Sequence, residues 1–369
     1  MRISLLLMAI SLSVGCGVGE ITDSVAQPNL VVLDEAVAAG LTVEANRLTV
    51  ATGAAGALAS ARVGDVIVSN GPAPFLRKVV AVESQAGQLA LVTEPAALTD
   101  AILRGHVSSE RDVFAEPLPT GYDGLIIPIN NLALDFTNNK IIDEVGIQVT
   151  LNRGTVRFRP YVDVDLKIED GSLSHFHAIV RGDLEASVGI SIDSTRSFNR
   201  GFSKTLWQSP PYTATQFIGT VPVVEVVRVS LILTGEAHAT AGGRVDLGSA
   251  TAKASVEAGA SYTDGRWRPV ANPSISFNAR GPSFTVGASA GASVRLSTRV
   301  DVKFYDVAGP YVVVGAYART DLSASVSNGL DWVSRAGVDA MFGGHVAVLG
   351  KTLAEYNRSL FDVGKDFAQ

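Results

Sequence analysis

Strict alternation of apolar and polar residues is the dominant pattern in the second half of the chain. From Thr155 to Glu169 every even position is apolar or proline, and most odd positions are charged. A period of two places successive side chains on opposite faces of a β-strand. Asp170-Gly171 predicts a tight turn, and the alternation then continues to Ile192. The pattern predicts a hairpin of two long antiparallel strands with one dry face.

The same alternation recurs over residues 223–241, 245–262, 283–305, 311–326 and 333–348, with a weaker strand at Ser274–Ala279. At about 3.3 Å per residue the longest of these strands would exceed about 50 Å, so we expect β-bulges to interrupt them, with the glycines as natural sites. In a sandwich or wrapped sheet the apolar faces would meet each other, whereas in an outer-membrane β-barrel they would face lipid. Alanine- and glycine-rich apolar faces and only 7% aromatic residues favour the sandwich.

The predicted fold class is all-β, in three parts. Residues 29–116 form a small N-terminal β module, in which short strands are punctuated by glycines and a short helix covers Ala96–Leu103. Residues 122–348 form the long-stranded antiparallel β domain. Residues 349–369 carry Leu353, Tyr356, Leu360, Phe361 and Phe367 at near-helical spacing, which predicts a C-terminal amphipathic helix packed on the sheet. The segments GDVIVS, FLRKVVAV and LALVTEPAALTDAI resemble N-terminal β modules of uncharacterised bacterial extracellular proteins.

The N-terminus has the layout of an export signal. Arg2 precedes an apolar run from Ile3 to Leu12, and small residues lead to Cys16, the single cysteine of the chain. The run is too short to span a bilayer as a helix. This segment resembles the lipobox of bacterial lipoproteins, although Ser13 stands where that family usually has leucine. The resemblance implies a signal peptide over residues 1–15, lipidation at Cys16 and a tether over residues 16–28.

These features predict a protein of the cell envelope that is anchored to a membrane through its N-terminal lipid. Gly17 follows the cysteine, and by resemblance to enterobacterial sorting this favours the outer membrane. A net charge of −6 and the lack of a basic run argue against nucleic acid as a partner. The remaining candidate partners are an envelope glycan or a surface protein.

The sequence contains no recognisable catalytic motif, and we expect neither a metal nor another cofactor. His175 and His177 share a strand face, but a structural zinc site needs four ligands at recognisable spacing. Asp163 and Asp165 also share a face, which could serve a two-carboxylate hydrolase. Charges of alternating sign in the same row are more typical of an exposed sheet face with cross-strand pairing.

The region Ser194–Thr220 is predicted to be a long connection rich in aromatic residues. It offers Phe202, Trp207 and Tyr212 beside Arg200, with Pro210-Pro211 between them. Exposed aromatic residues beside polar groups could stack on sugar rings or dock a partner. The alternative is a satellite apolar cluster that caps one end of the sheets.

The resulting functional hypothesis is a surface lipoprotein that acts as a non-enzymatic binding or structural module for a glycan, lipid or protein. One alternative is an envelope polysaccharide hydrolase or lyase whose site assembles from distant strands. Another is an outer-membrane β-barrel or a lipid carrier.

Overall fold

The computed structural model describes residues 24–368, apart from residues 72, 86, 113–131, 241–242, 285–289, 326–328 and 345–355. Cys16, the predicted signal peptide and most of the predicted tether therefore lie outside the described residues. Three sheets make up the described fold, and almost all strand pairs are antiparallel. The all-β prediction is confirmed.

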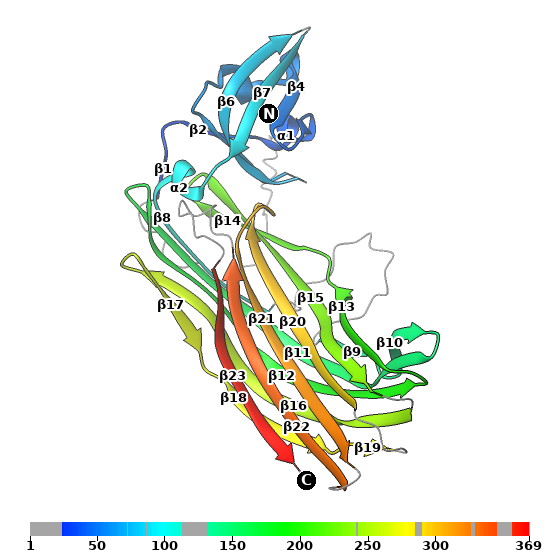
Figure 1. Cartoon of the computed structure of the whole chain (residues 1–369). Coiled ribbons are helices and arrows are strands. Elements are labelled where there is room, and N and C mark those ends of the chain that lie inside the picture. Colours follow the sequence, from blue (N-terminus) through cyan, green and yellow to red (C-terminus); the bar gives the residue numbers. More distant parts are fainter. Residues whose placement is uncertain are drawn as a thin grey trace, which may run out of the picture.

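Two large sheets pack face to face, and a smaller sheet lies at one end of them (Figure 1). The ten-stranded sheet contains β1 (Val25–Ala26), β8 (Ile102–Asp112), β9 (Leu132–Asp135), β10 (Asn139–Glu144), β11 (Ile147–Glu169), β12 (Ser172–Ser194), β16 (Gly243–Thr263), β17 (Arg266–Ala271), β18 (Ser274–Arg280) and β19 (Ser283–Phe284). The seven-stranded sheet contains β13 (Phe198–Gln208), β14 (Tyr212–Ile218), β15 (Val221–Ala239), β20 (Ala290–Phe304), β21 (Pro310–Ser325), β22 (Gly329–Gly344) and β23 (Tyr356–Ala368).

The six-stranded sheet belongs to the N-terminal part of the chain. Its strands are β2 (Leu30–Val32), β3 (Thr42–Val43), β4 (Arg47–Ala51), β5 (Val66–Ser69), β6 (Phe75–Gln85) and β7 (Gln88–Pro95). The helical elements α1 (Glu35–Ala39), η1 (Thr52–Ala54) and η2 (Gly56–Ser60) lie between its strands in sequence, and α2 (Leu98–Ala101) leads into β8. The short helix predicted before Gly105 is thus present as α2.

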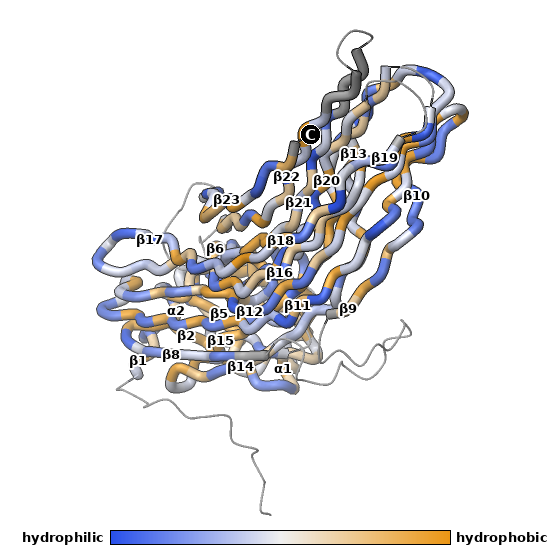
Figure 2. The backbone as a smooth tube through the Cα atoms, turned by 90° about the horizontal axis from the view of Figure 1, so that it is seen from below, coloured by the Kyte–Doolittle hydropathy of each residue, from blue (hydrophilic) through white to orange (hydrophobic). Residues whose placement is uncertain are grey.

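The alternation along the chain becomes the two faces of each large sheet. In β11 the even positions from Val156 to Ile168 are buried, with Phe158 only 1% exposed, while the charged odd positions face outward. Hydrophobic and hydrophilic positions alternate along β11, β12 and β16 in Figure 2. Phe176 of β12 meets Phe304 of β20 with ring centroids 6.3 Å apart, so the apolar faces of the two sheets are turned toward each other. The predicted long-stranded antiparallel sandwich is confirmed.

The predicted turns and bulges are also present. Asp170 and Gly171 have φ values of 49° and 66°, and Asp264 and Gly265 have 53° and 76°. Two consecutive left-handed residues are typical of tight hairpin turns, which explains the Asp-Gly pairs. The register of β11 and β12 shifts between Leu151 and Arg153, and that of β12 and β16 shifts after Gly189. These bulges interrupt strands of 23 residues.

The predicted C-terminal helix is wrong. Tyr356–Ala368 forms β23, which pairs with β22 at the edge of the seven-stranded sheet. A register shift opposite Ala340 and Met341 leaves Leu360 as an extra residue, so Leu360 and the adjacent Phe361 both pack against the core. A bulge breaks the period of two, and it made the apolar spacing resemble that of a helix.

The region Ser194–Thr220 is not the long connection that we predicted. It forms β13 and β14, and both strands pair with β15. Positions of β13 that share a face alternate between aromatic and cationic residues, namely Phe198, Arg200, Phe202 and Lys204. An edge strand is only partly covered by the opposite sheet, and it therefore lacks the continuous apolar face that the prediction required.

The apolar core runs from the sandwich into the smaller sheet. Val66 and Val68 of β5, Leu76 of β6 and Leu98 of α2 belong to the same buried cluster as the interior of the two large sheets. A separate small cluster, which includes Leu48, Leu58 and Leu91, fills the other side of the six-stranded sheet. The smaller sheet is therefore joined to the sandwich by buried apolar contacts.

Candidate functional site

A row of histidines and carboxylates lies on the outer face of the ten-stranded sheet. His106 Nε2 of β8 is 3.0 Å from Asp165 Oδ2 of β11, and His175 Nε2 of β12 is 3.7 Å from the other oxygen of the same carboxylate. Side chains from three adjacent strands thus meet at one aspartate. We refer to Asp163, Asp165 and the groups in contact with them as the histidine–aspartate row.

The second carboxylate of the row has a similar arrangement. Asp163 accepts contacts from His177 Nε2 and from Arg181 Nη2, each at 3.0 Å. Arg181 Nε also donates to Glu257 at 3.0 Å, and Asn272 Nδ2 donates to the other oxygen of Glu257 at 2.7 Å. The hydrogen bonds from Asn272 and Arg181 lower the pKa of Glu257 below its ordinary value.

These contacts link the polar side chains of the row mainly to one another. Among the residues that the structure describes, no group of three or more His, Cys, Asp or Glu side chains is arranged to hold a metal ion. The row therefore has the geometry of cross-strand ion pairing, which ties β8, β11, β12 and β16 together.

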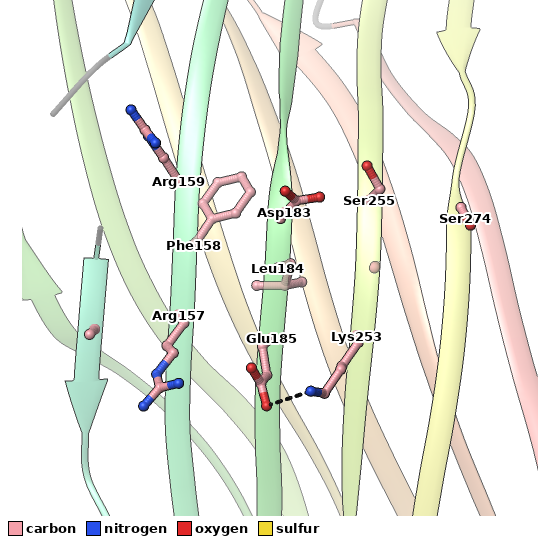
Figure 3. A pocket seen from close by; sticks show the side chains of 11 residues that line it. Arg157, Phe158, Arg159, Asp183, Leu184, Glu185, Lys253, Ser255 and Ser274 are labelled. Carbon is pink, nitrogen blue, oxygen red and sulfur yellow. Dashed lines mark ion pairs between the residues drawn. The ribbon is translucent and has the colours of Figure 1, made fainter. Parts of the chain in front are cut away.

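Farther along the same outer face lies an open hollow of about 760 Å³ (Figure 3). Its lining residues come from β9, β11, β12, β16 and β18 and include Arg157, Asp183, Glu185 and Lys253. Glu185 and Lys253 form an ion pair at 3.3 Å. The side chains of Arg157 and Asp183 make no hydrogen bond or ion pair with any described residue. The hollow can thus offer both a guanidinium and a carboxylate to a ligand.

The outer face of the seven-stranded sheet carries a second cluster, built from β20, β21, β22 and β23. Arg295 Nε donates to both oxygens of Asp339 at 2.9 Å. Tyr317 Oη donates to Asp362 Oδ1 at 2.6 Å, and Arg335 Nε donates to the same phenol oxygen at 3.2 Å. We call this set of side chains the tyrosine–arginine cluster. They line an open hollow of about 420 Å³.

Burial changes the titration of two groups in the tyrosine–arginine cluster. Desolvation raises the pKa of Asp339 above its ordinary value, and the nearby Arg295 only partly opposes that shift. Desolvation and the hydrogen bond with Asp362 raise the pKa of Tyr317. Asp339 and Asp362 are cross-strand neighbours, so two carboxyl groups in different environments face the same hollow.

The residues predicted for ligand binding lie elsewhere. Phe202, Trp207 and Tyr212 are half-buried and pack against the core at the β13–β14 edge, while Arg200 is exposed. The three aromatic residues pack against the main core of the sandwich, and none of the four residues lines the hollows described above. Their part in binding stays a prediction, and Cys16 lies outside the described residues.

The sequence analysis did not identify Tyr317, Arg335 or Asp362. Tyr317 and Arg335 occupy polar positions of the alternation over residues 311–326 and 333–348. The prediction of strands rested on the apolar positions alone. Asp362 fell in the segment predicted to be helical, so its position opposite Asp339 could not be anticipated.

Neither a family model, nor a curated protein, nor a solved structure matches the chain. Within the described residues, the structure has no helix of the length and apolar character needed to cross a membrane.

Proposed function

We propose that this protein is a lipid-anchored component of the bacterial cell envelope and acts as a non-enzymatic binding module. In this proposal Cys16 carries the lipid, and the sandwich presents its polar outer faces to an envelope ligand. The resemblance of residues 1–16 to a lipobox supports the anchor. The geometry of the sandwich supports the binding role.

One observation carries the binding role: the hollows described above are open and lie on polar sheet faces. Their volumes of about 760 and 420 Å³ fall in the range of about 300–1,000 Å³ that is typical of ligand sites. Their walls combine guanidinium, ammonium, carboxylate and hydroxyl groups, which suit a polar ligand.

The anchor is tested by expressing the full chain and Cys16→Ala in a bacterial host with a palmitate analogue. The parent chain is expected to incorporate the label and to sediment with the outer-membrane fraction. Cys16→Ala is expected to lose both properties, because two or three acyl chains hold a protein at a membrane where one is marginal. Equal labelling or equal sedimentation of the two proteins would rule out the anchor.

A second candidate function is hydrolysis of an envelope polysaccharide at the tyrosine–arginine cluster. The observation that favours it is the cross-strand pair Asp339 and Asp362, since glycoside hydrolysis uses two neighbouring carboxyl groups and burial raises the pKa of Asp339. The two functions are separated by incubating the purified protein with envelope polysaccharides and measuring new reducing ends and unsaturated products. If the protein turns over a polysaccharide and Asp339→Asn abolishes that turnover, the protein is an enzyme and not a non-enzymatic binding module.

A further inference from the structure

Tyr317 lies flat on the outer face of the seven-stranded sheet because glycines occupy the neighbouring strands. A Cβ atom built on Gly337 would lie 2.3 Å from Cζ of Tyr317, and one built on Gly364 would lie 2.6 Å from its hydroxyl oxygen. Any other residue at these two positions would collide with the phenol. One face of the ring therefore rests on β22 and β23, and the ring forms part of the lining of the 420 Å³ hollow.

The hydroxyl of Tyr317 is held in place at its tip. It donates to Asp362, and it accepts a hydrogen bond from Arg335 Nε. Arg335 is itself held by Asp366 through Nη1 at 3.1 Å. A ring fixed at its polar end and supported from below loses little further freedom when a ligand binds on it, which favours affinity.

Tyr311, on the same face of β21, provides a built-in contrast. It also lies over a glycine, because a Cβ on Gly343 would be 2.4 Å from its ring. The guanidinium of Arg299, however, sits 3.8 Å from the centroid of the Tyr311 ring and covers it. No such cation–π contact is found for Tyr317 within the described part of the chain. Of these two tyrosines, only Tyr317 has a ring face available for stacking.

The rim of the hollow around Tyr317 carries both guanidinium and carboxylate groups. Three guanidinium groups (Arg295, Arg319 and Arg335) and two carboxylates (Asp339 and Asp362) line it, and two of the guanidinium groups are also paired with Asp321 and Asp366. Arg319 uses Nε to contact Asp321 at 2.9 Å and is 61% exposed, so its terminal N–H groups can meet a ligand.

We propose that this hollow binds an acidic saccharide, with a sugar ring stacked on Tyr317 and the sugar carboxylate held by Arg319. The inference rests on the proposed binding function and names its ligand class. The free face of an aromatic ring accommodates the apolar face of a sugar, while hydroxyl groups need donors and acceptors close to the ring. The terminal N–H groups of Arg319 are planar donors that match a carboxylate, and Asp339 and Asp362 accept from hydroxyl groups.

The test uses the full-length purified protein in detergent with trigalacturonate as the probe and neutral maltotriose as the comparison. Titration calorimetry is expected to show binding of trigalacturonate that weakens as salt is added, because the arginine contacts are exposed to screening. Maltotriose is expected to bind at least several-fold more weakly. Equal binding of the two sugars would overturn the assignment to an acidic ligand.

Variants then locate the site. Tyr317→Ala is expected to weaken trigalacturonate binding by roughly tenfold, as removal of a central aromatic anchor commonly does. Tyr317→Phe keeps the ring and is expected to retain most of the affinity. The matched control Tyr311→Ala is expected to bind as the parent does, since Arg299 already covers that ring. Thermal melts followed by circular dichroism establish that each variant is folded.

If Tyr317→Ala does not fold, Arg319→Ala decides the matter, because Arg319 is exposed and its loss should weaken binding of the acidic sugar alone. Absence of trigalacturonate binding to the parent, or binding that neither variant weakens, would overturn the inference. The proposed function fails by different results, namely membrane association independent of Cys16 or turnover of a polysaccharide.

Discussion

At the scale of single residues, cross-strand polar contacts decide what the outer faces can do. Glu257 is an example, since it accepts hydrogen bonds from Arg181 of the neighbouring strand β12 and from Asn272. These donors stabilise the ionised carboxylate and lower its pKa. A carboxylate with a lowered pKa in the folded state stabilises the fold above its unfolded-state pKa of about 4.3, and this stabilisation is lost as the pH falls through the folded-state pKa.

We predict that Glu257→Gln lowers the free energy of unfolding by about 0.5–1 kcal/mol at pH 7, in keeping with partly exposed ion pairs. The difference from the parent should shrink below about pH 4, where the unfolded-state carboxyl also becomes protonated, and should then close. Urea denaturation at pH 7 and at progressively lower pH measures it. Glu236→Gln is the control, because Glu236 is exposed. A difference that grows on acidification would contradict the assignment.

At the scale of elements, β23 is an edge strand that the sequence pattern predicted wrongly as a helix. Its pairing with β22 places Gly364 opposite Gly337, directly beneath the hydroxyl of Tyr317. Asp362 and Asp366 reach side chains of β21 and β22 from the same strand. The tyrosine–arginine cluster therefore depends on β23 being a strand, and a helix over the same residues would not align these groups.

A substitution at Gly364 distinguishes the strand from the predicted helix by the sign of its effect. In the strand, the new Cβ of Gly364→Ala would lie 2.6 Å from the Tyr317 hydroxyl and 3.0 Å from Arg335 Nε, so we expect a loss of about 1 kcal/mol in stability. In a helix the same change would stabilise by about 1 kcal/mol. Denaturant unfolding measures it. Gly201→Ala in β13 is the control, where the new Cβ would meet only a carbonyl oxygen at 3.8 Å.

At the scale of the whole molecule, the buried cluster joins the six-stranded sheet to the sandwich. Leu98 of α2 is fully buried and belongs to the cluster that also fills the space between the two large sheets. Nearby, β1 pairs with β8, and the backbone N–H of Gln27 donates to the carbonyl of Ala101 at 2.9 Å. Contacts of this kind favour cooperative unfolding of the two parts.

We predict that the full chain unfolds in one calorimetric transition and that Leu98→Ala lowers its midpoint, with a loss of about 2–5 kcal/mol typical of a buried leucine. Leu58→Ala, in the separate cluster of the small sheet, should shift the same transition. Scanning calorimetry of the three proteins is the measurement. Two transitions, of which Leu58→Ala moves only one, would show that the small sheet unfolds on its own.

The sequence by itself determined the strands that have one dry face. Residues 155–169 and 176–192 alternate because each inward side chain is covered by the opposite sheet, and the Asp-Gly pairs provide the left-handed residues of the turns. These properties depend on local geometry and on which face is buried. The residue pattern of a single chain therefore indicates both the local geometry and the buried face.

Only the tertiary structure decided what lies at the sheet edges and on the outer faces. The edge strands β13 and β23 are covered on part of one face, so neither needs a continuous apolar row, and a bulge in β23 displaces its period. Tyr317, Arg335 and Asp362 come from three strands that are brought together by pairing. Pairing depends on contacts between distant segments, and a pattern read along one segment does not contain them.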